Sequence, residues 1–201
     1  PVAVWSWNVA LAWVCGNVCI WKPSEKTPLC SIACQQIISE VLKENSMPEG
    51  ISCIINGGAE VGKWIAEDHR IALVSATGST RMGKDVGQRV ASRLGKSLLE
   101  LGGNNAIIIS PHADLNTAIP ASVFGAVGTC GQRCTSTRRL IVHESIFEEF
   151  INFLQKAYEQ LRIGNPLDEN NHVGPLIDLD AVEVYTDCLL YTSDAADDPT
   201  C

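Results

Sequence analysis

The sequence predicts an α/β fold with a largely parallel sheet, continued by a second α/β segment. Short runs of β-branched and apolar residues alternate with helical patterns along the chain, and such alternation is typical of βαβ units. Glycine, proline or asparagine closes most of these runs. The length of 201 residues is enough for one large domain, or for one and a half small ones, with a sizeable hydrophobic core.

In the first half of the chain, helices and strands are expected to alternate. Gly16 and Asn17 stop a short buried helix, and Pro23 ends the strand that follows. Pro28 suits the first turn of the next helix, whose apolar residues recur at helical spacing. Gly57 breaks the second strand. The elements expected here are a helix over 8–15, a strand over 18–22, a helix over 27–43, a strand over 51–55, a helix over 59–67, a strand over 71–74, a turn over 77–80, a helix from there to 93, and a strand over 97–101.

Gly102 and Gly103 mark the expected boundary between two domains. Beyond it, Asp114 is placed to cap a helix, and a later segment carries its apolar residues on one helical face. The elements expected here are a strand over 106–109, a helix over 114–127, a strand over 139–143 and a helix over 145–161. Residues 188–201 change character abruptly and resemble translated sequencing-adapter readthrough, so we expect a non-native tail outside the fold.

The composition argues against several kinds of partner and site. The net charge of −8 argues against binding to nucleic acid or an anionic membrane, because both need basic surface. Residues 1–21 are strongly apolar, but Asn8 and Gly16 interrupt them, so neither a membrane span nor a signal peptide is expected. The nine cysteines include no Cys-x-x-Cys pair. We therefore expect no metal site and a reducing compartment, the cytoplasm or, alternatively, the mitochondrial matrix.

Residues 128–135, Gly-Thr-Cys-Gly-Gln-Arg-Cys-Thr, form the candidate nucleophile segment. Cys130 and Cys134 stand among small and polar residues, a setting in which a thiol is available for chemistry. Nearby positive charge favours the thiolate, and Arg133 directly precedes the second cysteine. The residues alone leave two interpretations open. Cys134 is a catalytic nucleophile, or it is a buried structural cysteine, which is the more common fate of a free thiol.

Two motifs near the start of the chain carry polar groups suited to a ligand. The amide of Asn8, beside Trp7 at the head of an apolar helix, can donate to a developing oxyanion or can cap the helix. Lys22 and Glu25 come directly after a strand. They can hold the hydroxyls of a ribose, or they can form a solvated charged turn.

Two further motifs follow later strands. Residues 78–83, Gly-Ser-Thr-Arg-Met-Gly, place small residues at a helix N-terminus, which suits a phosphate group. Glu100 ends an apolar strand beside two glycines. It is either a general base on a water molecule, buried so that its protonated form is favoured, or a structural carboxylate in a salt bridge.

In this order, the motifs resemble those of the NAD(P)-dependent aldehyde dehydrogenase superfamily. The similarity covers about residues 1–187, and its most specific parts are Glu-Leu-Gly-Gly at 100–103 and Gly-Gln-Arg-Cys-Thr at 131–135. The resemblance implies that Cys134 is the nucleophile and that Glu100 activates the water that hydrolyses a thioester. It implies that the Asn8 amide and the Cys134 backbone N–H hold the oxyanion. Cys130 stands where alanine is more common, and we hypothesise that it pairs with Cys134 under oxidation.

The resemblance also implies a Rossmann-like cofactor domain over residues 1–101 and part of an α/β catalytic domain over residues 102–187. NAD is the expected cofactor rather than NADP, because the Glu25 carboxylate repels the additional phosphate of NADP. The residues expected to bind the cofactor are Trp7, Lys22, Ser24, Glu25, Gly78, Ser79, Thr80, Gly83 and Leu101.

The particular residues of the motifs resemble one branch of the family, and this resemblance implies a substrate and an oligomeric state. Ser-Trp-Asn at 6–8 and Glu-Leu-Gly-Gly-Asn-Asn at 100–105 resemble the branch that oxidises α-aminoadipic semialdehyde in lysine breakdown. Another semialdehyde or betaine aldehyde is the alternative substrate, and a non-catalytic structural relative of the fold is the alternative class. The full-length protein is expected to be a homotetramer or homodimer. Because family segments for the nicotinamide ribose and for assembly lie outside the sequence, the 201-residue chain itself is expected to be inactive.

Overall fold

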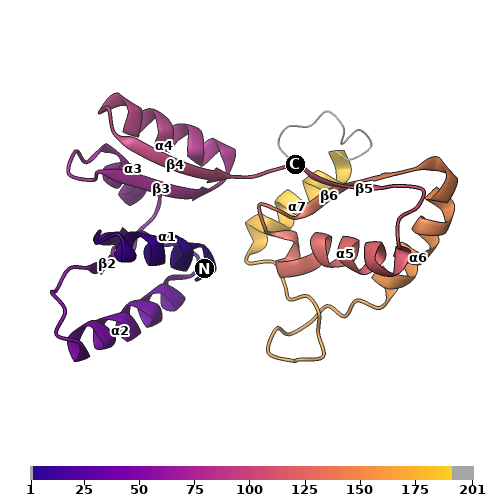
Figure 1. The fold of residues 1–201 in the computed structure, drawn as a ribbon, viewed down its shortest axis with the longest axis horizontal. Helices are drawn as coiled ribbons and strands as arrows, with labels where there is room; N and C mark the ends of the chain where they lie inside the picture. The colour runs from indigo at the N-terminus through magenta and orange to yellow at the C-terminus, as the bar shows by residue number, and fades with distance from the viewer. Residues whose placement is uncertain (1, 192–201) are drawn as a thin grey trace. The chain divides into compact units, whose positions relative to one another are not determined.

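The chain folds into two compact units, which are coloured indigo to magenta and pink to yellow in Figure 1. This computed structural model describes residues 2–191. The first unit ends at Leu101 and the second begins at Gly102. Residues 192–201, which make up most of the expected non-native tail, lie outside the described residues.

The first unit alternates helices and strands, as the sequence predicted. Its elements are α1 (Ala3–Val14), β1 (Cys19–Trp21), α2 (Pro28–Glu44), β2 (Ser52–Ile54), α3 (Ala59–Glu67), β3 (Leu73–Gly78), α4 (Thr80–Ser92) and β4 (Lys96–Leu101). Pro28 is the first residue of α2, where its missing N–H costs no helical hydrogen bond. Ser79 caps α4, since its hydroxyl accepts a hydrogen bond from the Met82 backbone N–H at 3.1 Å.

Two boundaries in this unit differ from the prediction by more than two residues, while several others differ by one or two. Helix α1 begins at Ala3 rather than at Asn8, because the apolar residues before Asn8 continue the helix. Strand β3 runs to Gly78, through part of the segment predicted as a turn. Parallel pairing explains this extension, since Gly78 is the register partner of Leu101 at the end of β4. A neighbouring strand therefore lengthened β3 beyond what its own residues indicate.

The second unit carries its core between a helix pair and a strand pair (Figure 1). Its elements are β5 (Asn105–Ile109), α5 (Leu115–Val127), the 3₁₀ turn η1 (Gly128–Gly131), β6 (Thr137–Val142), the 3₁₀ turn η2 (Glu144–Ile146), α6 (Phe147–Glu159) and α7 (Leu179–Tyr191). Ile109, Ile119, Phe150 and Leu154 form the buried cluster. Asp114 caps α5 as predicted, accepting from the Asn116 backbone N–H at 3.0 Å.

Helix α7 was not predicted, and it extends through the first residues of the expected tail to Tyr191. Its sequence, Leu-Asp-Ala-Val-Glu-Val-Tyr-Thr-Asp-Cys-Leu-Leu-Tyr, mixes good helix formers with β-branched residues, so local preference alone does not identify it. The start of the predicted helix over 145–161 is also different, because η2 takes up its first turn before α6 begins at Phe147.

All strands pair in parallel, which confirms the predicted fold class, but they do not form one sheet. Within residues 2–191 the ladders are separate two-stranded pairs, β1 with β2, β3 with β4 and β5 with β6. The largely parallel sheet expected for the first unit is therefore divided into two separate ladders. Alternation of helices and strands predicts the direction of pairing, but it does not decide which strands share an edge.

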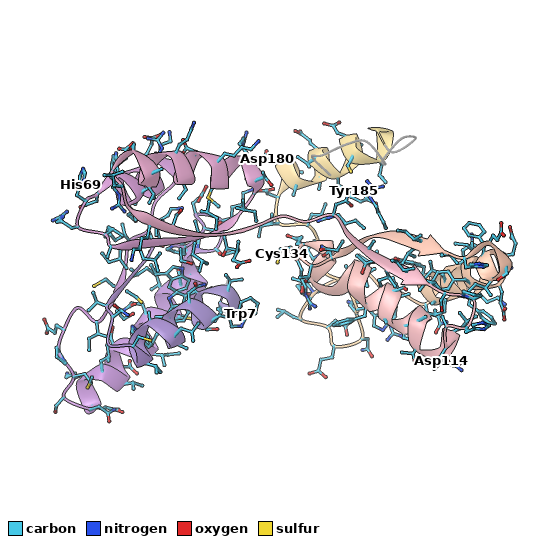
Figure 2. All side chains as sticks on the ribbon, turned by 45° about the horizontal axis from the view of Figure 1, so that its top comes forward. Trp7, His69, Asp114, Cys134, Asp180 and Tyr185 are labelled. Carbon is cyan, nitrogen blue, oxygen red and sulfur yellow. The ribbon has the colours of Figure 1, made fainter. Side chains whose placement is uncertain are left out.

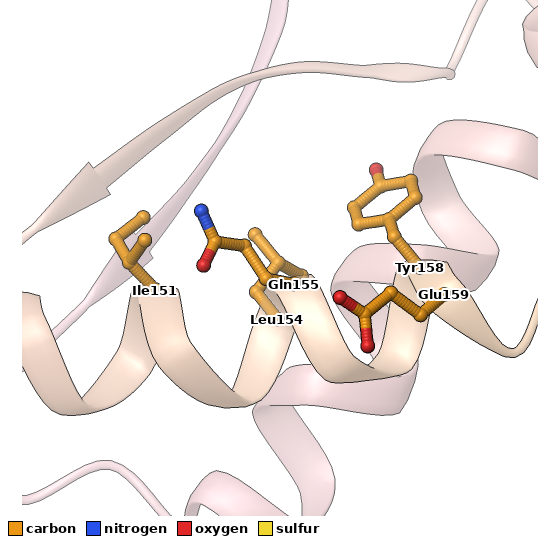
Figure 3. Close-up of a pocket in the computed structure, with 5 residues that line it drawn as sticks. All are labelled: Ile151, Leu154, Gln155, Tyr158 and Glu159. Carbon is orange, nitrogen blue, oxygen red and sulfur yellow. The ribbon is translucent and has the colours of Figure 1, made fainter.

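An open hollow of about 650 Å³ runs along α6, as Figure 3 shows. It is lined by Ile151, Leu154, Gln155, Tyr158 and Glu159, and burial raises the pKa of the Tyr158 hydroxyl above its ordinary value. None of the predicted site residues lines this hollow. The candidate chemistry therefore lies at the strand ends and loops of the two units rather than in this space.

Candidate active site

The ends of β3 and β4 bring two of the predicted motifs side by side. Thr77 pairs with Glu100 and Gly78 pairs with Leu101, so the Gly-Ser-Thr segment and the Glu-Leu-Gly-Gly segment leave the ladder together. Both strands end here because parallel strands place their carboxyl ends at the same edge. Glu100 is exposed, so the predicted burial of this carboxylate is wrong for this chain. A two-stranded ladder leaves the Glu100 side chain open to solvent.

Gly83 lets the first turn of α4 approach this edge closely. A Cβ atom at Gly83 would lie 2.4 Å from Leu101 Cδ2 and 3.1 Å from Leu101 Cγ. Gly83 is itself buried. The glycine predicted to bind the cofactor therefore has a structural role as well, because it makes room for the Leu101 side chain that ends β4.

Alanine at Gly83 is expected to destabilise the full-length protein relative to alanine at Gly87. Both glycines lie in α4, where alanine is intrinsically preferred by about 1 kcal/mol. At Gly87 the new Cβ would meet Leu99 Cδ1 at an ordinary 3.4 Å, whereas at Gly83 it would overlap Leu101. We expect Gly83→Ala to be less stable than Gly87→Ala by about 1–3 kcal/mol. Urea denaturation measures the difference, and equal midpoints would contradict the close contact.

Asn8 lies inside α1 and bridges it to β3. Its Nδ2 donates to the Val4 carbonyl at 2.9 Å, and its Oδ1 accepts from the Ser75 hydroxyl at 2.8 Å. The alternative that Asn8 caps a helix is wrong, because Val2 stands at the N-cap position. The amide group is held from both ends. A side chain held in this way presents its remaining amide hydrogen in a defined direction.

Aromatic contacts anchor α1 over the end of β1. The Trp5 ring stacks on the Trp21 ring, with centroids 4.3 Å apart and planes 13° apart. Trp7, next along the helix, is 64% exposed, and Figure 2 shows it on α1. Trp7 is therefore available for contact with a ligand, while Trp5 supports the helix.

Lys22 and Glu25 form an ion pair directly after β1. The Lys22 Nζ atom lies 3.2 Å from Glu25 Oε2, and the lysine side chain is only 19% exposed. The pKa of the Glu25 carboxyl lies below its ordinary value, because its own backbone N–H and then the Lys22 ammonium donate to it. The neighbouring Ser24 hydroxyl accepts from the Lys26 backbone N–H at 3.3 Å. Glu25 is consequently ionised at neutral pH, with its carboxylate more than half exposed.

The nucleophile segment turns sharply between α5 and β6. Thr129, Cys130 and Gly131 all have left-handed backbone conformations, with φ values of 55°, 54° and 68°. A non-glycine residue rarely adopts this conformation, and two in succession mark a constrained turn. After this turn the chain runs through Cys134 to β6.

The two cysteines of this segment have different surroundings. Cys134 is exposed, and Figure 2 shows its side chain beside the end of α5. Cys130 is half-buried, and its Sγ lies 3.3 Å from the Gly174 carbonyl oxygen, to which it donates. The interpretation of Cys134 as a buried structural cysteine is therefore wrong, and Cys130 is the thiol with a structural contact.

Buried Ser136 closes a tight turn around Cys134. The Arg133 backbone N–H donates to the Ser136 hydroxyl at 3.1 Å, and the Ser136 backbone N–H donates to the Arg133 carbonyl at 3.1 Å. Ser136 is only 2% exposed. The Arg133 guanidinium lies over the Phe124 ring at 5.2 Å and donates to the Thr129 hydroxyl, so it also braces the turn.

The predicted site residues are divided between the two units. Asn8, Glu100 and all of the predicted cofactor-binding residues belong to the first unit, whereas Cys134 belongs to the second. The sequence interpretation missed Asn105, whose amide contacts the Cys134 carbonyl oxygen at 2.7 Å. Its place in the Glu-Leu-Gly-Gly-Asn-Asn motif was the available signal.

Two kinds of feature are absent from the residues that the structure describes. No group of three or more His, Cys, Asp or Glu side chains there is arranged to hold a metal ion. Between residues 2 and 191, no helix has both the length and the apolar character needed to cross a membrane.

Comparison with known proteins identifies the class of protein to which this arrangement of strands, glycines and an exposed thiol belongs. The sequence model described as the aldehyde dehydrogenase family matches residues 1–195, and the chain belongs to that family. Among curated relatives, the chain is 51% identical over 185 residues to the alpha-aminoadipic semialdehyde dehydrogenase of Bos taurus, an overlap covering 92% of this chain and 34% of that protein. It is 49% identical over 176 residues to aldehyde dehydrogenase family 7 member B4 of Arabidopsis thaliana, covering 88% and 35%. The chain thus spans about one third of the length of these relatives.

Solved structures have the same fold. Glyceraldehyde-3-phosphate dehydrogenase from Methanocaldococcus jannaschii, complexed with NADP, superposes with a TM-score of 0.84 at 36% identity, over 89% of this chain and 39% of that one. Betaine aldehyde dehydrogenase from Staphylococcus aureus, in complex with NAD+, superposes with a TM-score of 0.82 at 32% identity, over 90% and 36%.

Proposed function

We propose that the full-length protein containing this chain oxidises an aldehyde to a carboxylic acid through a thioester on Cys134. The observation that carries this proposal is the exposed Cys134 thiol in a turn whose backbone is hydrogen-bonded on both sides. A nucleophile must be reachable and oriented, and this thiol meets both requirements. Family membership supports the choice of an aldehyde as the group attacked.

In the first half of the proposed reaction, the Cys134 thiolate attacks the aldehyde carbon and forms a C–S bond. The negative charge moves to the former carbonyl oxygen. The Asn8 side-chain amide and the Cys134 backbone N–H are assigned to stabilise it, since donors aimed at developing charge lower the barrier. A bound nicotinamide would supply the acceptor for the hydride that leaves the adduct, and Cys134 would then carry a thioester.

In the second half, Glu100 takes a proton from a water molecule as the water attacks the thioester carbon. The C–S bond breaks, the acid is released and the Cys134 thiolate is restored. A carboxylate at the end of a strand is suited to general base chemistry, and the exposure of Glu100 in this chain leaves it accessible to water.

The first unit carries groups that fit a dinucleotide. We assign its residues 1–101 to cofactor binding and residues 102–187 to the catalytic domain. Ser79 stands at the N-terminus of α4, where backbone N–H groups and the helix dipole suit a phosphate. Gly78 and Leu101 end the paired strands β3 and β4, and Thr80 and Gly83 lie in the first turn of α4. Lys22, Ser24, Glu25 and Trp7 are the other proposed contacts.

NAD is the proposed cofactor in preference to NADP. The ionised Glu25 carboxylate can accept hydrogen bonds from ribose hydroxyls, but it repels a phosphate in their place. Lys22 offsets part of this repulsion, since the ion pair at 3.2 Å brings a cation to the same point. The exposed half of the Glu25 carboxylate is the part that would face the ribose.

Glu25→Gln is expected to relax the preference for NAD. Removal of the charge should change the ratio of kcat/KM for NAD to that for NADP by on the order of tenfold in favour of NADP. Steady-state kinetics of the full-length protein with each cofactor measures this ratio. Glu40→Gln, at an exposed carboxylate in α2, is the matched control. An unchanged ratio in Glu25→Gln would contradict the assignment.

The proposed substrate is α-aminoadipic semialdehyde, an intermediate of lysine breakdown. The 51% identity to a relative named for this substrate supports it, and another semialdehyde or betaine aldehyde is the alternative. The full-length protein is proposed to be a homotetramer or homodimer in the cytoplasm or the mitochondrial matrix. A non-catalytic relative is disfavoured because Asn8, Glu100 and Cys134 are all present.

An assay of the full-length protein with NAD and a panel of aldehydes tests the proposed function. The highest kcat/KM is expected for α-aminoadipic semialdehyde. A higher kcat/KM for betaine aldehyde would refute the substrate and leave the thioester chemistry standing. No oxidation of any aldehyde would refute the proposed activity itself.

A further inference from the structure

The segment after Glu100 is bound to the segment around Cys134 by a set of side-chain hydrogen bonds. The Asn105 Nδ2 atom donates to the Cys134 carbonyl at 2.7 Å and to the Ser136 carbonyl at 3.2 Å. These contacts join residues about thirty positions apart in the sequence, and all of them lie within the second unit. They connect the residues that follow the Glu-Leu-Gly-Gly motif to the end of the Gly-Gln-Arg-Cys-Thr motif and the residue after it.

Two arginine side chains form further hydrogen bonds between the same two segments. Arg138 Nε donates to the Gly103 carbonyl at 3.2 Å, and Arg139 Nε donates to Asn104 Oδ1 at 3.1 Å. A Cβ atom at Gly103 would lie 3.3 Å from the Cys134 carbonyl oxygen. The absence of a side chain at Gly103 therefore permits the close approach of the two segments.

Asn105 is suited to this contact by its chemistry. A neutral primary amide has two N–H donors on one nitrogen, so it can serve two carbonyl oxygens at once. An aspartate has the same shape but carries no donor at neutral pH, and its charge would repel both oxygens. Asn105 is half-buried, so the lost bonds would be only partly replaced by water.

Together with Ser136, Asn105 restrains the nucleophile on both sides. The Asn105 bond holds the peptide that follows Cys134, and the Ser136 backbone N–H, which donates to the Arg133 carbonyl, holds the peptide that precedes it. Rotation about both backbone bonds of Cys134 is limited as a result. The direction of the thiol and of the Cys134 N–H depends on these two bonds.

We propose that Asn105 is a positioning residue that orients Cys134 for attack on the aldehyde, and this rests on the proposed function. Asn105 acts through the Cys134 backbone and not on the substrate. Loss of its donor lets the Cys134 turn relax, so the thiol and the oxyanion-binding N–H leave their aligned positions. A misplacement of about 1 Å in a reacting group can lower a rate by about a hundredfold.

The test compares Asn105→Asp with Asn104→Asp in the full-length protein. Both variants exchange an amide for a carboxylate, but Asn104 uses its oxygen to accept from Arg139, and a carboxylate retains that bond. Asn105→Asp is expected to lower kcat by about tenfold to a hundredfold, with KM for NAD nearly unchanged. Asn104→Asp is expected to retain kcat within about threefold.

A second measurement follows the reactivity of the Cys134 thiol directly. The rate of Cys134 alkylation by iodoacetamide at a fixed pH, followed by mass spectrometry, is expected to fall in Asn105→Asp and to stay near the wild-type rate in Asn104→Asp. Loss of stability alone would expose the thiol further rather than slow its alkylation. If Asn105→Asp fails to fold, Asn105→Ser replaces it, since a hydroxyl retains one donor and should give an intermediate kcat.

Several outcomes would overturn the proposal. They are wild-type kcat and alkylation in both Asn105 variants, an equal loss in Asn104→Asp, or a raised KM for NAD with unchanged kcat. A wild-type protein that oxidises no aldehyde would instead refute the proposed function. In that case the alkylation rates would still decide whether Asn105 orients the Cys134 thiol.

Discussion

Cys134→Ala in the full-length protein is expected to lower kcat for aldehyde oxidation by at least about a thousandfold, with NAD binding retained. The methyl group of alanine cannot form the C–S bond, and no neighbouring thiol occupies the same place. Cys134 is exposed and its side chain is not part of the core, so the substitution should leave the fold intact.

Cys130→Ala is the matched control for this variant. Cys130 lies in the same 128–135 segment, but it is half-buried and donates to the Gly174 carbonyl. We expect its activity to stay within about fivefold of wild type, because only weak thiol contacts with the Gly174 and Pro175 carbonyl oxygens are lost. Formation of reduced cofactor measures both variants, and calorimetry measures their NAD binding. An active Cys134→Ala, or an inactive Cys130→Ala with an intact Cys134, would show that the nucleophile is assigned to the wrong thiol.

Glu100→Gln is expected to slow hydrolysis of the thioester by about a hundredfold to ten-thousandfold, the usual contribution of a general base. Attack by Cys134 and formation of reduced cofactor do not need this carboxylate in the proposed mechanism. The variant should therefore release about one equivalent of reduced cofactor per site in a rapid burst and then turn over slowly. Intact-protein mass spectrometry should detect the acyl group on Cys134 during the slow phase.

Glu44→Gln tests whether the slower hydrolysis of the thioester is specific to removal of the Glu100 carboxylate. Glu44 is an exposed carboxylate at the end of α2, and its substitution should leave both the burst and the steady state unchanged. A Glu100→Gln variant that lost the burst together with steady-state turnover would place Glu100 in the first half of the reaction. Unchanged steady-state turnover would remove Glu100 from the mechanism.

The sequence was sufficient for most helices and for the direction of strand pairing. Helix α3 occupies its predicted residues, and Asp114 caps α5 as expected, because capping depends on residues a few positions apart. The sequence was not sufficient for the length of β3 or for the number of ladders. Both depend on which strand lies alongside, and this is decided by contacts far apart along the chain.

Some features of the candidate site could likewise be predicted from the sequence, whereas others depend on tertiary structure. The proximity of the Gly-Ser-Thr and Glu-Leu-Gly-Gly segments follows from parallel strands ending at one edge, so it could be predicted. The exposure of Glu100 could not, since it depends on what covers the ladder. The contact between Asn105 and Cys134 also depends on tertiary structure, because an asparagine after two glycines has no local pattern that indicates its partner.

The sequence by itself determined the residue types available for chemistry: the thiol of Cys134, the carboxylate of Glu100 and the amide of Asn8. It also determined their order and their placement on a parallel α/β framework. Only the tertiary structure separated the two thiols, because exposure of Cys134 and the contact of Cys130 with Gly174 arise from chain segments distant in sequence. The side chains that are present determine which covalent chemistry is available, whereas their accessibility and orientation depend on how the chain packs.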